Sequence, residues 1–236
     1  MSTSTQPSTL QIVVIGDPKR LDLDEQKLIG LIRALPTAHR SKLRALKEGA
    51  AYECAIVPWN EPDTSSAAVI DAIEQYVLSP LREAGFDAVL LQADAVNRRK
   101  KVLVADMEST IIEQEMLDEL GDLIGKRTVI EDITARAMRG EIDFEQALGE
   151  RVAMLAGLDA SVLDEVSDRI TIMPGARELV ATMKANGAYC ALVSGGFTFF
   201  TERIAHMLGF DEHQANTLEI ANGKITGRVT PPILGR

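Results

Sequence analysis

The chain has 236 residues, of which 46% are hydrophobic and 25% are charged. Its 35 acidic residues outnumber its 25 lysines and arginines, so the net charge is −10 at pH 7. The apolar fraction excludes an intrinsically disordered chain, and the length fits one large domain or two small ones. The acidic balance argues against a general nucleic-acid or anionic-membrane partner, because both carry negative charge. It does not exclude a small anionic substrate, whose site needs only local positive charge.

The sequence contains two cysteines, Cys54 and Cys190, which provide neither a metal-binding spacing nor a disulfide framework. This usage fits a reducing compartment. No apolar run approaches the roughly 18 residues of a membrane span. Residues 1–9 are small and polar and lack the basic start and apolar stretch of a secretory signal. We therefore expect a cytoplasmic protein with no membrane partner.

Short apolar runs alternate with helical patterns in the first 96 residues. The pattern predicts strands at 10–15, 53–57 and 88–91 and helices at 22–35 and 65–81. This alternation is typical of a small α+β sandwich.

A basic run, Asn-Arg-Arg-Lys-Lys at 97–101, follows this region. Such a run is typical either of a nucleic-acid-binding patch or of a solvated linker. The negative net charge favours the linker. We therefore expect a domain boundary here, with domains at 1–96 and 97–236.

The second region is predicted to be an α/β domain with a long helical insertion. Strands are predicted at 102–105 and 189–193, and a hairpin is predicted around the Asn-Gly turn at 222–223. Helices are predicted at 113–124, 129–139, 144–155, 160–170, 176–185 and 199–208. The two strands stop at Asp106 and at Ser194. Because ligands of open α/β sheets lie outside the carboxyl ends of the strands, these two positions indicate a site.

Two carboxylates, Asp106 and Glu108, lie where the first of these strands ends. A turning chain can direct both at one site, where one could attack a phosphate monoester and the other could donate a proton. Charge repulsion then requires a metal ion and cationic or N–H donors, and oxygen-only ligation suits Mg²⁺. The simpler interpretation is a helix N-cap built from Asp106, Ser109 or Thr110, and the pattern by itself favours it.

The second strand ends in Ser194, Gly195 and Gly196. Glycines let backbone N–H groups approach an anion closely, and the N-terminus of a following helix adds a favourable dipole. An ordinary strand-to-helix turn with a capping serine would have the same sequence. Together, however, the two strand ends could supply the two halves of a phosphate site. The helices between them could close over that site as a lid.

These motifs resemble those of a known family. The sequence Asp-Met-Glu-Ser-Thr at 106–110 resembles the first motif, DxDx[ST], of the haloacid dehalogenase superfamily, and Ser-Gly-Gly at 194–196 resembles the second. Within the superfamily, phosphoserine phosphatases are similar at 104–151 and 193–197, notably at 113–115, 137–140 and 143–147. The resemblance implies a Rossmann-like core with a helical cap at about 113–172. Residues 1–96 resemble, more weakly, the ACT-type regulatory domain that some of these enzymes carry.

The resemblance implies Mg²⁺-dependent hydrolysis of O-phosphoserine to serine and phosphate, the last step of serine biosynthesis. Asp106 would be the nucleophile that forms an aspartyl-phosphate, and it would also bind Mg²⁺. Glu108 would be the general acid and base and would offer the metal its backbone carbonyl. Ser194 and Gly195 would hold the phosphoryl oxygens.

The same resemblance implies how the serine part of the substrate is recognised. Glu115 would bind the ammonium group, and Arg151 would pair with the carboxylate through its bidentate guanidinium. Met138 and Phe144 would line the cap side of the pocket. Without the resemblance, Met138 and Phe144 would be interpreted as core residues, and Glu115 and Arg151 as solvated helix charges.

Two features depart from the family pattern. Glu108 stands where the family usually has Asp, and its extra methylene displaces the carboxyl group by about 1 Å, which can cost on the order of 10²-fold in rate. The family's third motif, a lysine, and its fourth, with metal-binding aspartates, would follow residue 236. We therefore expect that the C-terminal part of the core is missing, that the chain is part of a longer enzyme, and that by itself it is weakly active or inactive.

Two other functions are compatible with the sequence. One is a catalytically inactive regulatory protein that binds an amino acid through its first domain, and the other is a phosphatase for another small phosphomonoester. A zwitterionic substrate requires opposite charges at its two ends, so Glu115 and Arg151 discriminate between phosphoserine and neutral sugar phosphates. The sequence is also compatible with a homodimer.

Overall fold

A computed structural model describes residues 10–17, 22–35, 38–40, 42–58, 66–92 and 99–235 of the chain. The chain divides into two compact units, Met1–Arg98 and Arg99–Arg236. Each unit has its own core of buried apolar side chains.

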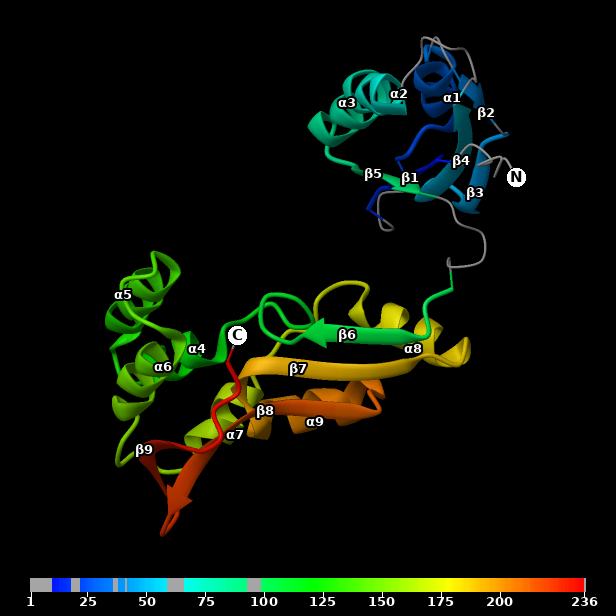
Figure 1. The fold of residues 1–236 in the computed structure, drawn as a ribbon. Helices are drawn as coiled ribbons and strands as arrows, with labels where there is room; N and C mark the ends of the chain where they lie inside the picture. Colours follow the sequence, from blue (N-terminus) through cyan, green and yellow to red (C-terminus); the bar gives the residue numbers. More distant parts are fainter. Residues whose placement is uncertain are drawn as a thin grey trace, which may run out of the picture. The chain divides into compact units, whose positions relative to one another are not determined.

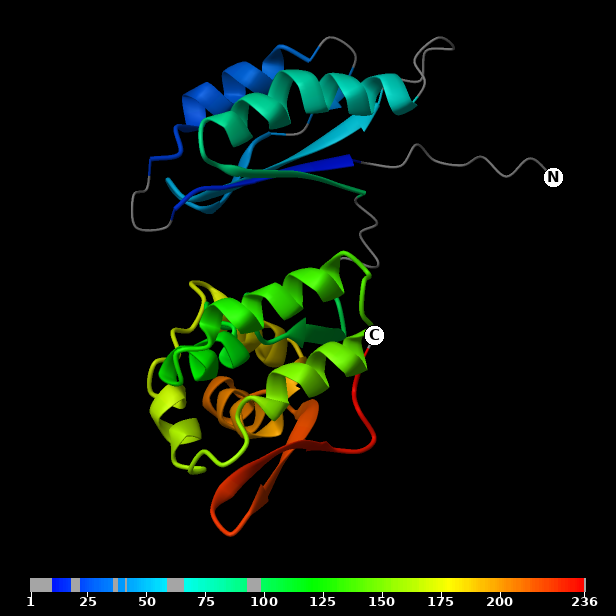
Figure 2. The ribbon, with the colours of Figure 1, turned by 90° about the vertical axis from the view of Figure 1, so that its left-hand side faces the viewer.

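The first unit is an antiparallel sheet with helices over one face (Figures 1 and 2). The strand order is β2-β4-β1-β5, and β3 also pairs with β4. This is the order of a split βαβ arrangement. The elements are β1 (Leu10–Ile15), α1 (Glu25–Arg33), β2 (Ala38–Arg40), β3 (Arg44–Lys47), β4 (Ala51–Pro58), α2 (Ser66–Ile73), the π-helix η1 (Glu74–Leu78), α3 (Ser79–Glu83) and β5 (Asp87–Gln92).

The three predicted strands of this unit are confirmed as β1, β4 and β5. The sequence pattern does not predict β2 and β3; all four residues of β3 are exposed, so that strand lacks the apolar alternation of a half-buried one. The predicted first helix begins at Glu25 because Asp24 caps it. The Oδ1 atom of Asp24 accepts hydrogen bonds from the backbone N–H groups of Gln26 and Lys27, at 2.8 and 3.4 Å.

The second unit is built on a mixed sheet with the order β6-β7-β8-β9. The strands are β6 (Val102–Asp106), β7 (Tyr189–Phe197), β8 (Glu212–Ala221) and β9 (Lys224–Thr230). The first three are parallel, and β8 and β9 form the antiparallel hairpin that the Asn-Gly turn predicts. The prediction of only two parallel strands is wrong, because β8 begins at Glu212 and pairs with β7 before it pairs with β9. Its first residues, Glu-His-Gln-Ala-Asn, carry no β-branched signal.

Six helices are assigned within the described part of the second unit. They are α4 (Met116–Leu123), α5 (Arg127–Met138), α6 (Phe144–Ala153), α7 (Val162–Ser167), α8 (Ala176–Ala185) and α9 (Thr198–Leu208). Figure 1 shows α8 and α9 alongside the sheet, whereas α4, α5 and α6 lie beyond the carboxyl ends of β6 and β7. Among the residues described here, no helix combines the length and apolar character needed to cross a membrane.

Two short connectors join the segment α4–α7 to the sheet, and they run antiparallel to each other. Ile112 and Ile172 form a β-bridge, and the N–H of Glu113 donates to the carbonyl of Thr171 at 3.0 Å. The side chain of Gln114 fastens the same pair of connectors. It donates to the Thr171 hydroxyl at 3.1 Å and to the carbonyl of Arg169 at 3.2 Å, and it accepts from the Thr171 N–H at 2.9 Å. Both ends of the helical segment are thus joined next to the end of β6, and a second β-bridge, between Asp159 and Lys224, connects the segment to β9.

Candidate active site

The parallel pairing of β6 and β7 brings the two sequence motifs together. Asp106, the last residue of β6, pairs with Val193, the residue before Ser194. Because parallel strands end at the same edge of a sheet, the carboxylates after β6 and the glycines of β7 lie side by side, as the sequence predicts. The helices α4, α5 and α6 face this edge (Figure 2).

The chain turns tightly after Asp106. The carbonyl of Met107 accepts hydrogen bonds from the N–H groups of Ile111 and Ile112, at 2.8 and 3.0 Å. Within this turn Ser109 has a φ of 52°, in the left-handed region that residues with side chains rarely adopt. Asp106 is exposed, and its Oδ1 accepts from the Met107 N–H at 2.7 Å. The turn therefore leaves the Asp106 carboxylate at the open edge of the sheet.

Glu108 points back from this turn into the unit. Its Oε1 accepts a hydrogen bond at 2.9 Å from the N–H of Met116, the first residue of α4. Its carboxyl group also lies against Gly196, where an added Cβ would be 2.9 Å from Oε2. A side chain at position 196 would therefore push against the Glu108 carboxyl group. The N-cap interpretation of Asp106, Ser109 or Thr110 is wrong, because the next helix, α4, begins only at Met116. The side chain that accepts from its first N–H group is Glu108.

The surroundings of Glu108 raise the pKa of its carboxyl group from 4.5 to about 7. Burial is the largest cause; the negative charges of Glu115 and Asp106 act in the same direction. The hydrogen bond from Met116 and the positive charge of Arg151 oppose the shift. A carboxyl group that titrates near neutral pH can both donate and accept a proton there, which is what acid–base catalysis requires.

Glu115 and Ser109 are joined across the same turn. The Ser109 hydroxyl donates to Oε1 of Glu115 at 2.6 Å. Glu115 is the residue immediately before α4, and its negative charge contributes to the raised pKa values of both Glu108 and Asp118. For Asp118, burial is the largest cause and Glu115 is the next. The strand end and the start of α4 thus form an acidic region that favours a cation.

Arg151 supplies positive charge near this acidic region. It lies half-buried on α6, where its Nε donates to the carbonyl of Ala147 at 3.1 Å and its Nη1 donates to the Thr134 hydroxyl at 3.3 Å. Burial lowers the pKa of the guanidinium, and the charges of Glu108, Asp118 and Glu115 raise it. Arg151 is therefore not the solvated helix charge that its sequence alone suggests.

The glycine motif forms a bulge in β7 rather than the end of the strand. The ladder to β8 continues from Val193 to Phe197 on one side while it advances only from Gln214 to Asn216 on the other. Ser194 is only 2% exposed, and its Oγ accepts a hydrogen bond at 2.9 Å from the N–H of Gly196. The prediction that β7 stops at Ser194 is wrong, because pairing resumes beyond the bulge. Helix α9 begins directly afterwards, at Thr198.

Phe144 and Met138, the two apolar candidates, have different environments. Phe144 is the first residue of α6 and lies against the glycine bulge, since an added Cβ on Gly195 would be 3.3 Å from its ring. The Phe144 ring also lies against Gly235, where an added Cβ would be 3.1 Å from the ring atom Cδ1. Met138 ends α5 and is 78% exposed, so the interpretation of Met138 as a core residue is wrong. The structure brings Phe144, but not Met138, against another candidate site residue.

Sequence reasoning overlooks several side chains that shape this site: Thr134, which holds Arg151; Gln114, at the connectors; and Asn216 of β8. The Nδ2 atom of Asn216 donates to the carbonyl of Gly195 at 2.8 Å. No sequence signal could have identified Asn216, because a single asparagine before a predicted hairpin has no motif.

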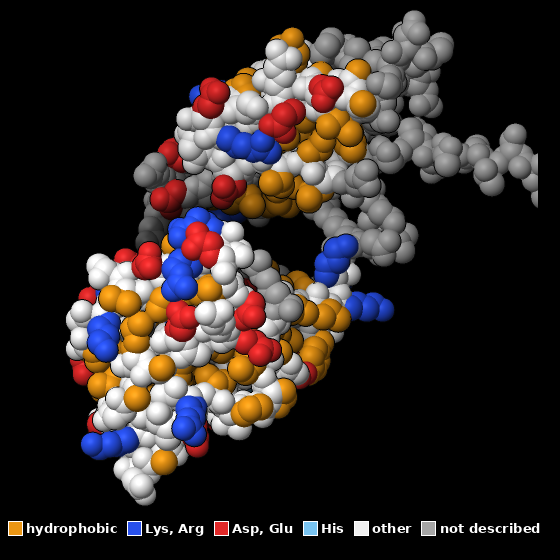
Figure 3. Space-filling view, turned by 60° about the vertical axis from the view of Figure 1, so that its left-hand side comes forward, with side chains coloured by type: hydrophobic (Ala, Val, Ile, Leu, Met, Phe, Trp, Pro, Cys, Tyr) orange, Lys and Arg blue, Asp and Glu red, His pale blue; other side chains and the backbone are white. Residues whose placement is uncertain are grey.

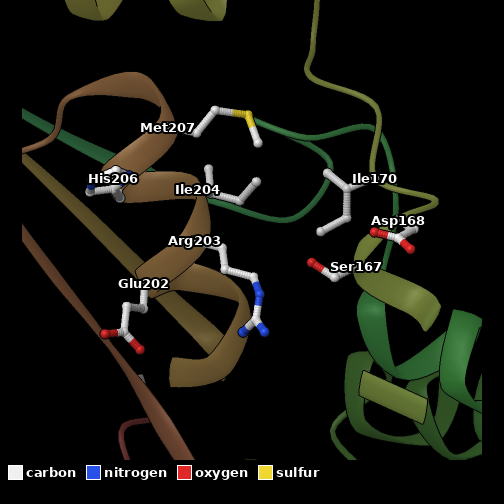
Figure 4. A pocket seen from close by; sticks show the side chains of 8 residues that line it. All are labelled: Ser167, Asp168, Ile170, Glu202, Arg203, Ile204, His206 and Met207. Carbon is white, nitrogen blue, oxygen red and sulfur yellow. The ribbon is translucent and has the colours of Figure 1, made fainter. Parts of the chain in front are cut away.

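One other cavity of the second unit lies apart from the candidate residues. A cavity of about 650 Å³ lies between α9 and the end of α7 (Figure 4), and none of the candidate residues lines it. Its lining residues are Ser167, Asp168, Ile170, Glu202, Arg203, Ile204, His206 and Met207. On the face drawn in Figure 3, acidic and basic side chains of the second unit are interspersed and do not form a basic surface.

The donor set at the site consists of oxygen atoms. Within the described ranges, no group of three or more His, Cys, Asp or Glu side chains is arranged to hold a metal ion. The exposed Asp106 carboxylate and the main-chain carbonyl of Glu108 are oxygen donors of the kind that Mg²⁺ takes. This ion is usually held by one or two carboxylates together with substrate phosphate and water.

The fold and this site define the class of the protein. Residues 103–236 match the family model described as haloacid dehalogenase-like hydrolase. The chain therefore belongs to the haloacid dehalogenase-like hydrolase family.

Within this class, the chain is similar to phosphoserine phosphatases. It is 43% identical over 177 residues to the phosphoserine phosphatase of Streptomyces coelicolor, covering 72% of this chain and 43% of that protein. It is 45% identical over 150 residues to the phosphoserine phosphatase of Archaeoglobus fulgidus, covering 64% of this chain and 44% of that protein. The chain thus spans less than half the length of these relatives.

Solved structures of the family, including phosphoserine phosphatases, are also similar to this chain. A haloacid dehalogenase family hydrolase from Salmonella enterica serovar Typhi matches with a TM-score of 0.71 and 27% identity, over 95% of this chain and 73% of that one. A probable phosphoserine phosphatase from Vibrio cholerae matches with a TM-score of 0.66 and 27% identity, over 99% of this chain and 67% of that one. A substrate-bound phosphoserine phosphatase complex matches with a TM-score of 0.53 and 36% identity, over 56% of this chain and 63% of that one.

Proposed function

We propose that this chain is the catalytic part of an enzyme that hydrolyses O-phosphoserine to serine and phosphate through an aspartyl-phosphate. One observation carries the proposal: Asp106 pairs with the residue before the glycine bulge, so a carboxylate nucleophile and an anion-binding backbone share one edge of the sheet. The relatives named phosphoserine phosphatase support the choice of substrate.

Two carboxyl groups would divide the chemistry. A carboxylate oxygen of Asp106 attacks phosphorus, the bond from phosphorus to the serine oxygen breaks, and protonated Glu108 gives its proton to the leaving oxygen. Glu108, now ionised, then takes a proton from water as the water oxygen attacks phosphorus. That step releases phosphate and restores the Asp106 carboxylate. A pKa of about 7 lets Glu108 serve in both protonation states.

Three side chains would recognise the serine part. Glu115 supplies a negative charge for the ammonium group at the start of α4, and Arg151 supplies a guanidinium for the carboxylate from α6. Phe144, which lies against the bulge, would cover the site. The role of Met138 in lining the cap side of the pocket stays a prediction.

The Asp106 carboxylate and the Glu108 main-chain carbonyl would hold Mg²⁺. When bound, this ion would neutralise charge on the phosphoryl group during attack by a carboxylate. The oxygen donors at the strand end support this assignment.

We further propose that helices α4–α7 act as a cap and that the first unit is an ACT-like regulatory domain. The antiparallel pair of connectors at Ile112 and Ile172 supports the first proposal, since both ends of the helical segment leave the sheet at this joint. The split βαβ order of the first unit supports the second. A homodimer and a cytoplasmic location stay predictions.

The test is Mg²⁺-dependent phosphate release from O-phospho-L-serine, with phosphoethanolamine, which lacks the carboxylate, as a comparison substrate. We expect release from phosphoserine, weak for this chain by itself, that chelator abolishes and that exceeds release from phosphoethanolamine at least tenfold. Equal release from both would contradict the substrate assignment. Binding of serine without any release, from this chain or from a C-terminally extended one, would favour the regulatory alternative.

A further inference from the structure

Asn216 connects three parts of the second unit through a single buried amide. The side chain is 1% exposed and projects from β8. Its Nδ2 donates to the carbonyl of Gly195 at 2.8 Å and to the carbonyl of Leu234 at 3.0 Å. Its Oδ1 accepts from the N–H of Leu234 at 2.7 Å. The amide nitrogen and the amide oxygen of Asn216 thus both form hydrogen bonds. If the two atoms were exchanged, two carbonyls would face an oxygen and the N–H would face a nitrogen donor.

The peptide between Gly195 and Gly196 is consequently held at both ends. A trans peptide is planar, so its carbonyl and its N–H point in opposite directions. Asn216 holds the carbonyl, and the Ser194 hydroxyl oxygen accepts from the N–H of Gly196 at 2.9 Å. Glycine has no Cβ to restrict rotation of this peptide, so its orientation depends on these side chains.

The orientation of this peptide decides whether the bulge can bind an anion. A carbonyl oxygen turned toward a phosphoryl group would repel it, whereas a carbonyl bonded to Asn216 is not free to turn toward that group. Asn216 also fixes Leu234 next to Gly235, which lies against the Phe144 ring. The bulge, the ring and the segment at Leu234 are thus positioned together.

We propose that Asn216 is a positioning residue for phosphoryl binding, and that it acts by fixing the Gly195–Gly196 peptide. This inference rests on the proposed function, because it requires the bulge of β7 to be the phosphate site.

The test uses the intact chain and inorganic phosphate. Phosphate is titrated into ¹⁵N-labelled protein while the amide signals of Gly195 and Gly196 are followed. Asn216→Asp keeps the shape of the side chain but turns a carboxylate oxygen toward two carbonyl oxygens. Asn216→Ser is the milder second variant, since it adds no charge. Thr201→Val is the matched control, because Thr201 is also fully buried and bonds to His213 of β8 but not to the bulge.

We expect phosphate to shift both glycine signals in the unaltered chain and in Thr201→Val, with dissociation constants within twofold of each other. In both Asn216 variants the dissociation constant should rise at least tenfold. Amide exchange at Leu234 should also become faster. An unchanged phosphate affinity in either folded Asn216 variant would overturn the role of Asn216 and leave the proposed function intact. The absence of any glycine shift in the unaltered chain would overturn the phosphate site itself, and the inference with it.

Discussion

Glu108 accepts a hydrogen bond from the N–H of Met116 at 2.9 Å, and this contact joins the end of β6 to the start of α4. The first N–H groups of a helix have no partner within the helix, so an outside acceptor stabilises its start. The carboxyl group that we propose as acid and base therefore also fixes the helical segment. Any change at Glu108 should affect both the chemistry and the attachment of α4.

The raised pKa of Glu108 predicts that stability falls as pH rises. The folded state binds the Glu108 proton more tightly than the unfolded state does. The stabilisation is thus complete below pH 4.5 and is lost as pH rises through about 7. Glu108→Gln, which is neutral at every pH, should leave the free energy of unfolding little changed near pH 4.5. At pH 8 it should raise that free energy by up to about 3 kcal/mol.

Urea unfolding at the two pH values, in the presence of chelator, measures this difference. Glu113→Gln is the control, because Glu113 is an exposed neighbour of the same charge. Equal effects of Glu108→Gln at both pH values would contradict the pKa assigned to Glu108.

Arg151→Gln should raise KM for O-phosphoserine about 10- to 100-fold, the loss expected for a charge-assisted hydrogen bond worth about 1.5–3 kcal/mol. KM for phosphoethanolamine, which has no carboxylate, should change less than threefold. Arg136→Gln is the control: Arg136 lies on α5 and pairs with Glu150 at 3.2 Å. A similar loss with both substrates would argue against carboxylate recognition by Arg151.

Gly196→Ala should destabilise the second unit, because its new Cβ would lie 2.9 Å from Oε2 of Glu108. Overpacking of this kind typically costs about 1–3 kcal/mol. Gly149→Ala is the matched control; Gly149 lies within α6 and an added Cβ has no neighbour within 4 Å. That variant should instead stabilise the helix by roughly 0.5–1 kcal/mol. Thermal unfolding compares the two, and equal melting temperatures would show that Glu108 does not lie against Gly196.

Gln114→Ala should loosen the joint between the helical segment and the sheet. It removes three hydrogen bonds to the returning connector, each worth about 0.5–1.5 kcal/mol. Hydrogen exchange at Glu113 and Met173 should become faster, while exchange in β1 stays unchanged. Gln146→Ala, which removes an exposed contact to Glu150, provides the control. Unchanged exchange at both connector residues would show that Gln114 does not fasten the joint.

The sequence predicts the elements and motifs whose signals are local. Asp106 and Ser194 each follow an apolar run, and this is enough to predict that the two motifs lie side by side at one edge of the sheet. The Asn-Gly turn correctly predicts the hairpin. These signals depend on a few neighbouring residues and on the general rule for ligands of parallel sheets.

Features that depend on tertiary packing are not predictable in this way. The start of β8 is polar and becomes a strand only because β7 pairs with it. The bulge at Ser194 depends on where pairing resumes, and Asn216 acquires its role from two distant backbone segments. Burial is equally hard to predict from the sequence. The charged side chain of Arg151 is half-buried, whereas the apolar side chain of Met138 is exposed. Helical periodicity assigns a residue to a face but does not reveal what covers that face.

Transfer of phosphate to Asp106 is the central claim, and single-turnover labelling tests it most directly. The chain is mixed with ³²P-labelled O-phosphoserine and Mg²⁺, quenched in acid and treated with hydroxylamine, which cleaves acyl phosphates. We predict a hydroxylamine-sensitive label on the unaltered chain and on Asp122→Asn, an exposed aspartate of α4, and no label on Asp106→Asn. A label of equal strength on Asp106→Asn would contradict the claim that Asp106 is the nucleophile.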